Sequence, residues 1–138
     1  SGTLTTSYVR MLGENRKTRY FLLHLTNHDA GRDLMKECIW KACPNGGYYV
    51  RKTDNPAQQL LITPEPNLRP LRSWVIEKLG QGPRRWQSLL NEVRQEIWLE
   101  RHLNEVVREL RKDGKIQADQ YEKSFNPKNN PRFRLAAQ

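Results

Sequence analysis

The sequence predicts an α+β chain in which a small strand-helix-strand α/β segment is followed by a winged helix of three helices and a β-wing. Three observations carry this prediction. A dense apolar run at residues 20–25 has the length of a strand and precedes a helical pattern that stops at Pro44. Three helical patterns follow one another between residues 68 and 112. Two short alternating runs then enclose a basic loop at the end of the sequence.

The first segment is predicted to span residues 1–65, as the end of a larger sheet. An apolar patch at residues 8–12 is expected to form a helical turn, and residues 20–25 are expected to form a strand. Asn27 or Asp29 is expected to cap the helix that follows, by accepting a hydrogen bond from one of its first N–H groups.

That helix is expected to run to about Ala42 and to end at Pro44-Asn45-Gly46-Gly47, because proline cannot continue a helix and glycine tolerates positive φ. Two more strands are expected at residues 48–51 and 59–63. Residues 54–56, Asp-Asn-Pro, form the expected turn between them.

Pro64-Glu65-Pro66-Asn67 is a stiff break, and we place the domain boundary there. The second domain, residues 66–138, is predicted to be a winged helix. Its Leu110–Ile116 junction, with Asp-Gly at its centre, is typical of the connection from a recognition helix to a wing. The elements are expected, in order, as helices at 68–79, 84–96 and 99–112 and strands at 115–121 and 132–135.

The charge of the chain favours a polyanionic partner. It holds 24 Lys and Arg against 15 Asp and Glu, a net charge of +9, and its isoelectric point is near 9.9. Residues 66–138 contribute 15 of the cations and 9 of the acids, so the excess lies mainly in the predicted winged helix. Nucleic acid is the expected partner, and a merely soluble basic surface is the alternative.

The third predicted helix has an apolar side and a basic side. Its core-facing stripe is expected to be Leu99, Leu103, Val106, Val107 and Leu110. The opposite side is the one that enters the DNA major groove in helix-turn-helix proteins. There arginine can read guanine, asparagine can read adenine, and either can hold phosphate. The residues expected to bind nucleic acid on this helix are Arg101, Asn104, Arg108, Arg111 and Lys112, and those on the wing are Lys123, Lys128, Arg132 and Arg134.

The same helix also supports a simpler interpretation. Glu100, Glu105 and Glu109 lie among the cations at spacings that allow ion pairs along a helix. The basic side could therefore be a solvated, self-paired surface. The winged helix would then serve protein contacts, through Trp74, Trp86 and Trp98 and through the exposed edge of the sheet.

Catalysis by this chain alone is not expected. Its histidines near the first strand, His24 and His28, have no orienting partner beyond the adjacent Asp29, and the phosphate-binding glycine loops and the HExxH motif are absent from the sequence. Cys38 and Cys43 are spaced unlike a zinc pair and are expected to be buried free thiols in a reducing cytoplasm. We therefore expect no metal, no cofactor and no membrane span.

The stretch YFLLHLTNHDAGRDLMKECIW, residues 20–40, resembles a segment near the end of three-Cys-motif partner proteins, bacterial proteins encoded beside a radical-SAM-like protein. In that family a strand leads into a Thr-Asn-His turn, a glycine and a helix with Met-Lys and a tryptophan. The residues that match are Thr26, Asn27, His28, Gly31, Met35, Lys36 and Trp40, and Leu110, Gly114, Lys115 and Ile116 at the later junction.

The resemblance implies a Rossmann-type, methyltransferase-like domain followed by a winged helix, of which this chain is the C-terminal part. Residues 20–63 would then be the last strands and helix of the Rossmann-like sheet, and any catalysis would need a preceding part. The expected partner is DNA, with RNA as the alternative nucleic acid. A protein partner such as the three-Cys-motif protein is the rival, and the uncovered sheet edge would allow a homodimer.

Overall fold

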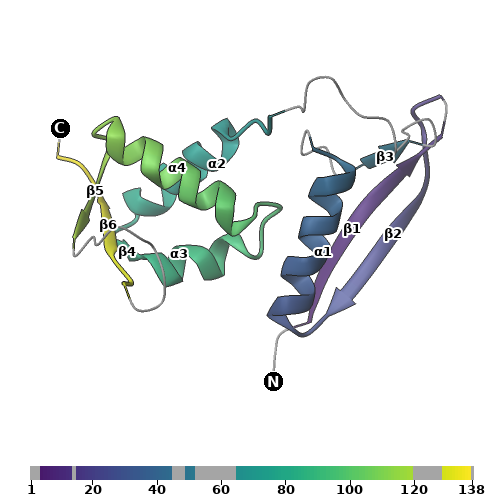
Figure 1. Cartoon of the computed structure of the whole chain (residues 1–138), viewed down its shortest axis with the longest axis horizontal. Helices are drawn as coiled ribbons and strands as arrows, with labels where there is room; N and C mark the ends of the chain where they lie inside the picture. The colour runs from purple at the N-terminus through teal and green to yellow at the C-terminus, as the bar shows by residue number, and fades with distance from the viewer. Residues whose placement is uncertain (1–3, 14, 45–48, 52–64, 120–128, 138) are drawn as a thin grey trace. The chain divides into compact units, whose positions relative to one another are not determined.

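A computed structural model describes residues 4–13, 15–44, 49–51, 65–119 and 129–137 (Figure 1). The chain divides into two compact units, Ser1–Asn67 and Leu68–Gln138. The predicted turn at residues 54–56, the predicted strand at 59–63, and the wing residues Lys123 and Lys128 lie outside the described residues.

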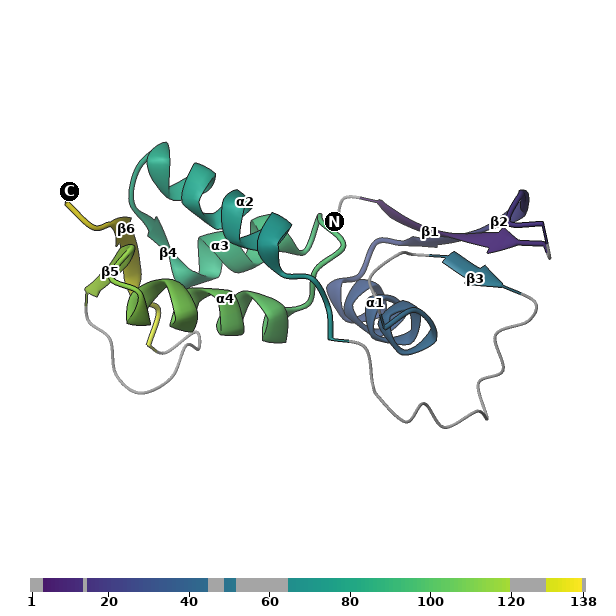
Figure 2. The same ribbon diagram turned by 90° about the horizontal axis from the view of Figure 1, so that it is seen from above.

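The first unit is a mixed sheet with one helix. Strands β1 (Thr5–Leu12) and β2 (Thr18–Thr26) form an antiparallel ribbon, helix α1 spans Asp29–Ala42, and β3 (Tyr49–Arg51) runs parallel to β1. The strand order is β2-β1-β3. Helix α1 lies along one face of this sheet (Figure 2).

The prediction of a helical turn at residues 8–12 was wrong, because these residues belong to β1. Tyr8 and Arg10 are exposed, whereas Val9 between them is buried, which is the period of two of a strand with one covered face. Pairing with β2 over most of its length fixes this conformation. The patch was too short for its period to be decided from the sequence.

The Thr26-Asn27-His28 turn is a helix start. His28, rather than Asn27 or Asp29, is the N-cap, and its Nδ1 accepts a hydrogen bond from the backbone N–H of Ala30 at 3.2 Å. The Thr26 hydroxyl accepts from the His28 N–H at 3.1 Å. A Cβ at Gly31 would lie 2.8 Å from Thr26 Oγ1, so this close approach requires glycine.

The prediction that Cys38 is buried was wrong. Cys38 is exposed, and so is Leu34 one turn earlier on the same side of α1. The buried side of the helix is carried by Ile39 and Trp40, and the buried thiol is that of Cys43 just after the helix. The spacing of Leu34 and Cys38 suggested a buried stripe, but the side of the helix that is buried is rotated away from them about the helix axis.

The second unit has the layout of a winged helix and confirms the predicted fold class. Its strands form an antiparallel sheet in the order β4-β6-β5. The elements are α2 (Arg69–Gly80), β4 (Arg84–Arg85), α3 (Trp86–Val93), α4 (Glu100–Lys112), β5 (Ile116–Asp119) and β6 (Arg132–Leu135).

The predicted second helix, residues 84–96, was too long at both ends. Arg84 and Arg85 form β4, because they pair with Phe133 and Arg132 of β6. After Val93 the backbone forms hydrogen bonds between residues three apart, in place of the four-residue spacing of an α-helix. One example is the bond from the Glu96 N–H to the Val93 carbonyl at 2.9 Å. The long-range pairing at the start could not be read from the local helical pattern.

The core of the second unit is formed by the apolar sides of its three helices and the inner face of its sheet. Trp86 of α3 and Phe133 of β6 are fully buried and meet edge to face, with ring centroids 6.3 Å apart. The predicted stripe of α4 is buried as expected. The other core side chains are Leu71, Val75, Leu79, Leu89, Leu90, Val93, Leu99, Leu103, Val106, Val107, Leu110 and Ile116.

The first N–H groups of α3 are satisfied from the far end of the chain. Its N-cap residue, Arg85, makes no side-chain capping bond. Instead the N–H of Trp86 donates to the Pro131 carbonyl at 2.9 Å, and the N–H of Gln87 donates to Asn130 Oδ1 at 2.9 Å. Asn130 therefore acts as a remote cap that ties the wing to the helix-turn-helix.

We expect Asn130→Ala to destabilise the second unit by about 1 kcal/mol, the usual cost of losing an N-cap acceptor. For a unit of this size such a change lowers the melting temperature by roughly 4–8 °C. Asn130→Asp is the matched control, since its carboxylate keeps an acceptor at the positive end of the helix. Thermal and urea denaturation of the three proteins measure the effect, and an Asn130→Ala protein as stable as wild type would contradict it.

Candidate nucleic-acid interface

The basic side of α4 faces solvent as predicted. Arg101, Arg108 and Lys112 are exposed, and Asn104 and Arg111 on its flank are half-buried. The opposite side is anchored in the core by Leu103, Val106, Val107 and Leu110, each fully buried. Because the helix cannot rotate without exposing these residues, its outward stripe of cations is fixed in direction.

Arginine 72 of α2 neutralises acids that flank this stripe. Its guanidinium contacts the carboxylate of Asp113 at 2.6 Å and that of Glu109 at 3.8 Å. Two of the acids that follow Arg108 in sequence are thus held by a cation from another helix. Glu105 remains on the basic side of α4 and lowers its net charge.

Both ends of α4 are defined by specific backbone interactions. At its start, the buried His102 side chain accepts a hydrogen bond from the Leu99 N–H through Nδ1 at 3.2 Å, which is one half of a capping box, since the leucine side chain has no acceptor for the other half. At its end, the Gly114 N–H donates to the Arg111 carbonyl at 3.0 Å and the Lys115 N–H to the Leu110 carbonyl at 2.9 Å. This is a Schellman motif, with Gly114 at φ +69°.

The Leu110–Ile116 junction therefore has a structural reason. Leu110 supplies the last buried side chain of α4 and the carbonyl that Lys115 bonds, while Gly114 adopts the left-handed conformation that reverses the chain. Ile116 returns to the core as the first residue of β5. The motif sets the angle at which the wing leaves the basic helix.

The wing sheet adds exposed cations. Arg132 and Arg134 of β6 face solvent, on the side opposite the buried Phe133. Arg134 lies 3.7 Å from Asp119 of β5, so part of its charge is compensated. A third cation, Arg85, was not predicted from the sequence; it is an exposed residue of β4 and the cross-strand neighbour of Arg132.

Arg85 was missed because it was assigned to a helix. The Gly82-Pro83 pair could have indicated this, because a Gly-Pro pair marks a turn. The residues that follow such a turn can be extended before the next helix begins. In the described structure the outer face of the sheet thus carries Arg85, Arg132 and Arg134.

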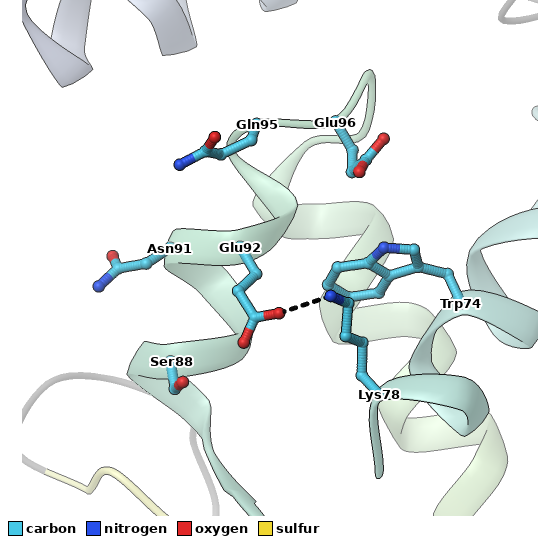
Figure 3. Close-up of a pocket in the computed structure, with 7 residues that line it drawn as sticks. All are labelled: Trp74, Lys78, Ser88, Asn91, Glu92, Gln95 and Glu96. Carbon is cyan, nitrogen blue, oxygen red and sulfur yellow. Dashed lines mark ion pairs between the residues drawn. The ribbon is translucent and has the colours of Figure 1, made fainter. Parts of the chain in front are cut away.

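A second surface feature lies on α2 and α3. It is a depression of about 340 Å³ lined by polar side chains around one aromatic ring (Figure 3). The Nζ of Lys78 lies 5.5 Å from the centre of the Trp74 ring and 2.9 Å from a carboxylate oxygen of Glu92. Glu92 also pairs with Arg84 at 2.7 Å. The lining residues are Trp74, Lys78, Ser88, Asn91, Glu92, Gln95 and Glu96.

Two of the three tryptophans expected to serve protein contacts are unavailable. Trp86 is fully buried, and Trp98 is 9% exposed and stacks edge to face on His102. Both rings stabilise the core of the second unit. Trp74 is half-buried and borders the depression, so it is the one member of that set that a partner could reach.

Other kinds of site find no support in the described part of the chain. No group of three or more His, Cys, Asp or Glu residues there is placed to hold a metal ion. His28 is used as a helix cap, and His24 lies within β2. Among the helices that the structure describes, none is both long and apolar enough to cross a bilayer.

Comparison with known proteins identifies the winged helix. Residues 47–120 match the GMT-like wHTH domain, a winged helix-turn-helix family, and the match covers more than half of the chain. It begins before β3 and runs through α2, α3, α4 and β5. No curated protein and no solved structure matches the chain significantly.

We expect Gly114→Ala to lower the free energy of unfolding of the second unit by about 1–2 kcal/mol, because alanine is strained at a left-handed φ. Gly80→Ala is the control: Gly80 is the last residue of α2, without positive φ, and its new Cβ would meet only Leu135 Cδ1 at 4.0 Å. Urea denaturation should show a loss for the first variant and no loss for the second. Equal stability of the two variants would contradict the assignment of the turn.

Proposed function

Because the chain belongs to the GMT-like wHTH domain family, we propose that its winged helix binds nucleic acid, with duplex DNA as the preferred form. The observation that carries the proposal is the outward stripe Arg101, Arg108 and Lys112 on a helix whose other side is locked in the core. In helix-turn-helix proteins the helix in this position enters the major groove.

The residues of α4 would make different kinds of contact with nucleic acid. Arg101, Arg108 and Lys112 are long, exposed cations suited to phosphates or to guanine edges. Asn104 is half-buried on the flank, where its amide could pair with adenine. Arg111 would hold phosphate beside them.

The wing would contact phosphates of the nucleic-acid backbone beside the groove that α4 enters. Arg132 and Arg134 are exposed on β6, and we add Arg85 of β4 to this set. Lys123 and Lys128 lie outside the described residues and stay predicted nucleic-acid-binding residues. We propose that the chain acts by binding and has no catalytic activity of its own.

Electrostatic pairing within the unit supports this assignment. Arg72 engages Glu109 and Asp113, and the Lys78 and Arg84 pair engages Glu92. Glu109 and Asp113 at the end of α4 are thereby paired with a cation of another element, whereas Glu92 belongs to α3. A face used only for solubility would not need its neighbouring carboxylates to be compensated from across the fold.

The test is fluorescence anisotropy of a labelled random duplex and of a single strand, titrated at several salt concentrations. For Z phosphates neutralised, the logarithm of the binding constant should fall with slope of roughly −0.9Z against the logarithm of salt. Replacing Arg101, Arg108 and Lys112 together by alanine should reduce the slope by about 2.7 and weaken binding at least tenfold at low salt.

The matched control removes the same charge elsewhere. Arg10, Lys17 and Lys41 are exposed cations of the first unit, and their joint replacement by alanine should leave affinity within about twofold. Equal loss in both triple variants would indicate non-specific attraction by net charge. Salt-sensitive binding that the α4 variant leaves intact would move the site to the wing, and absence of binding at low salt would reject the proposal.

The depression on α2 and α3 favours a second function, docking of a protein. Trp74 is half-exposed beside amide and carboxylate side chains, the composition of a small interface anchor rather than of a phosphate site (Figure 3). The resemblance of residues 20–40 to three-Cys-motif partner proteins suggests the radical-SAM-like three-Cys-motif protein as the partner. The implied Rossmann-like sheet in the first unit belongs to this same hypothesis.

We expect Trp74→Ala to weaken binding of a purified three-Cys-motif protein at least tenfold, measured by calorimetry in low and high salt. Such an interface should change little with salt, unlike binding to phosphates. Ile76→Ala is the control, because Ile76 is an exposed apolar residue of α2 outside the depression. Equal effects of the two substitutions, or no binding by the wild type, would reject this partner site.

A further inference from the structure

Helix α4 carries one exposed carboxylate that has no ionic partner in the described part of the chain. Three residues of the helix are glutamates. Glu100 lies in the first turn, where the helix dipole favours a negative charge, and Glu109 pairs with Arg72. Glu105 is exposed, and none of the described residues forms an ion pair with it. The self-paired surface that the spacing of charges allowed is therefore not formed at this residue.

Glu105 lies within the outward stripe rather than beside it. At about 100° per residue, its side chain points within roughly 60° of those of Arg101 and Arg108. It follows Arg101 by about one helical turn and precedes Arg108 by slightly less than one. The next residue, Val106, is fully buried and prevents the helix from turning Glu105 away. A groove that receives these two arginines therefore also receives the carboxylate.

A carboxylate at this position weakens binding to phosphates alone, because like charges repel. It becomes favourable only where a base offers it a hydrogen-bond donor. In the major groove guanine N7 and O6 and thymine O4 are acceptors, whereas cytosine presents the donor group of its N4 amine. Adenine places an acceptor, N7, beside its N6 amino group, which suits an amide that both donates and accepts. The chemistry of the Glu105 side chain thus matches cytosine best.

We propose that Glu105 is a specificity-determining residue that accepts a hydrogen bond from the N4 amino group of a cytosine in the major groove. This inference rests on the proposed binding of duplex DNA by α4. Arg101 and Arg108 supply attraction on either side of the carboxylate, through phosphates or guanine edges. Glu105 makes that attraction selective, because guanine and thymine at its position present acceptors to a negative charge.

Selection from a random duplex library with the full chain tests the preference for a base. For the wild type, one position of the selected sequences should be dominated by cytosine. Glu105→Ala should lose the preference at that position, and Glu105→Gln should change it to adenine, which a glutamine amide can bind through N6 and N7. Glu77→Gln is the matched control: Glu77 is an exposed glutamate of α2, so its loss changes the net charge equally but should leave the cytosine preference intact.

Fluorescence anisotropy at one fixed salt concentration then measures the discrimination. Replacing the selected C·G pair by T·A should weaken wild-type binding by roughly fivefold to 150-fold, the range of one good base contact. The same replacement should change binding by Glu105→Ala less than about twofold. A 2-pyrimidinone nucleotide in place of that cytosine, which lacks the N4 amino group, should likewise weaken the wild type and not the variant. Circular dichroism checks that each variant is folded.

Two results would overturn the inference and leave the proposed function standing. One is a Glu105→Ala protein that keeps the wild-type preference for cytosine. The other is a wild type that binds all duplexes equally, with Glu105→Ala and Glu77→Gln raising the affinity by the same factor, which would make Glu105 a repulsive charge only. Absence of binding to any duplex at low salt would instead reject the proposed function, and this inference with it.

Discussion

The second unit depends on the burial of one side of α4. Leu103, Val106, Val107 and Leu110 have no exposed surface, and the helix that carries them contacts α2 and α3 before it and β5 after it. Burying four such side chains contributes on the order of 6–12 kcal/mol, several times the value of any one surface ion pair. The direction of the basic side chains is a consequence of this burial, since a helix that fixes one face fixes the other. The residues of α4 that we propose for binding therefore need no dedicated scaffold beyond the core.

The remaining elements of that unit are held to α4 by local devices at its ends and by the wing. The Schellman motif at Gly114 sets where β5 begins, and Asn130 and Pro131 connect the end of the wing to the start of α3. Trp86 and Phe133 then close the core between these connections. A substitution at Asn130 would consequently alter the hydrogen bonds at the start of α3, although the two sites are more than forty residues apart in sequence.

The sequence predicted features that are set by periodicity and missed those that are set by distant partners. The α4 stripe, the limits of β6 and the extent of α1 all follow from spacing and from local stop signals, and the structure confirms them. The strand at Arg84–Arg85 depends on pairing with β6, and β1 depends on pairing with β2. In the candidate site the exposed cations of α4 were predictable, whereas Arg72 and Arg85 required the fold, because their roles come from residues far away in sequence.

Two surfaces of the chain differ in the kind of partner that physical chemistry allows. On α4, cations project from a helix whose nearby acids Glu109 and Asp113 are compensated, which suits a partner with regularly spaced negative charge. On β2, exposed apolar side chains at residues 20–23 and 25 outnumber the single cation Arg19, which does not suit a polyanion. Salt strengthens the distinction, since screening weakens the first kind of contact and leaves hydrophobic pairing nearly unchanged. The surface that we propose for a polyanion and the apolar surface of β2 thus belong to different units of the chain.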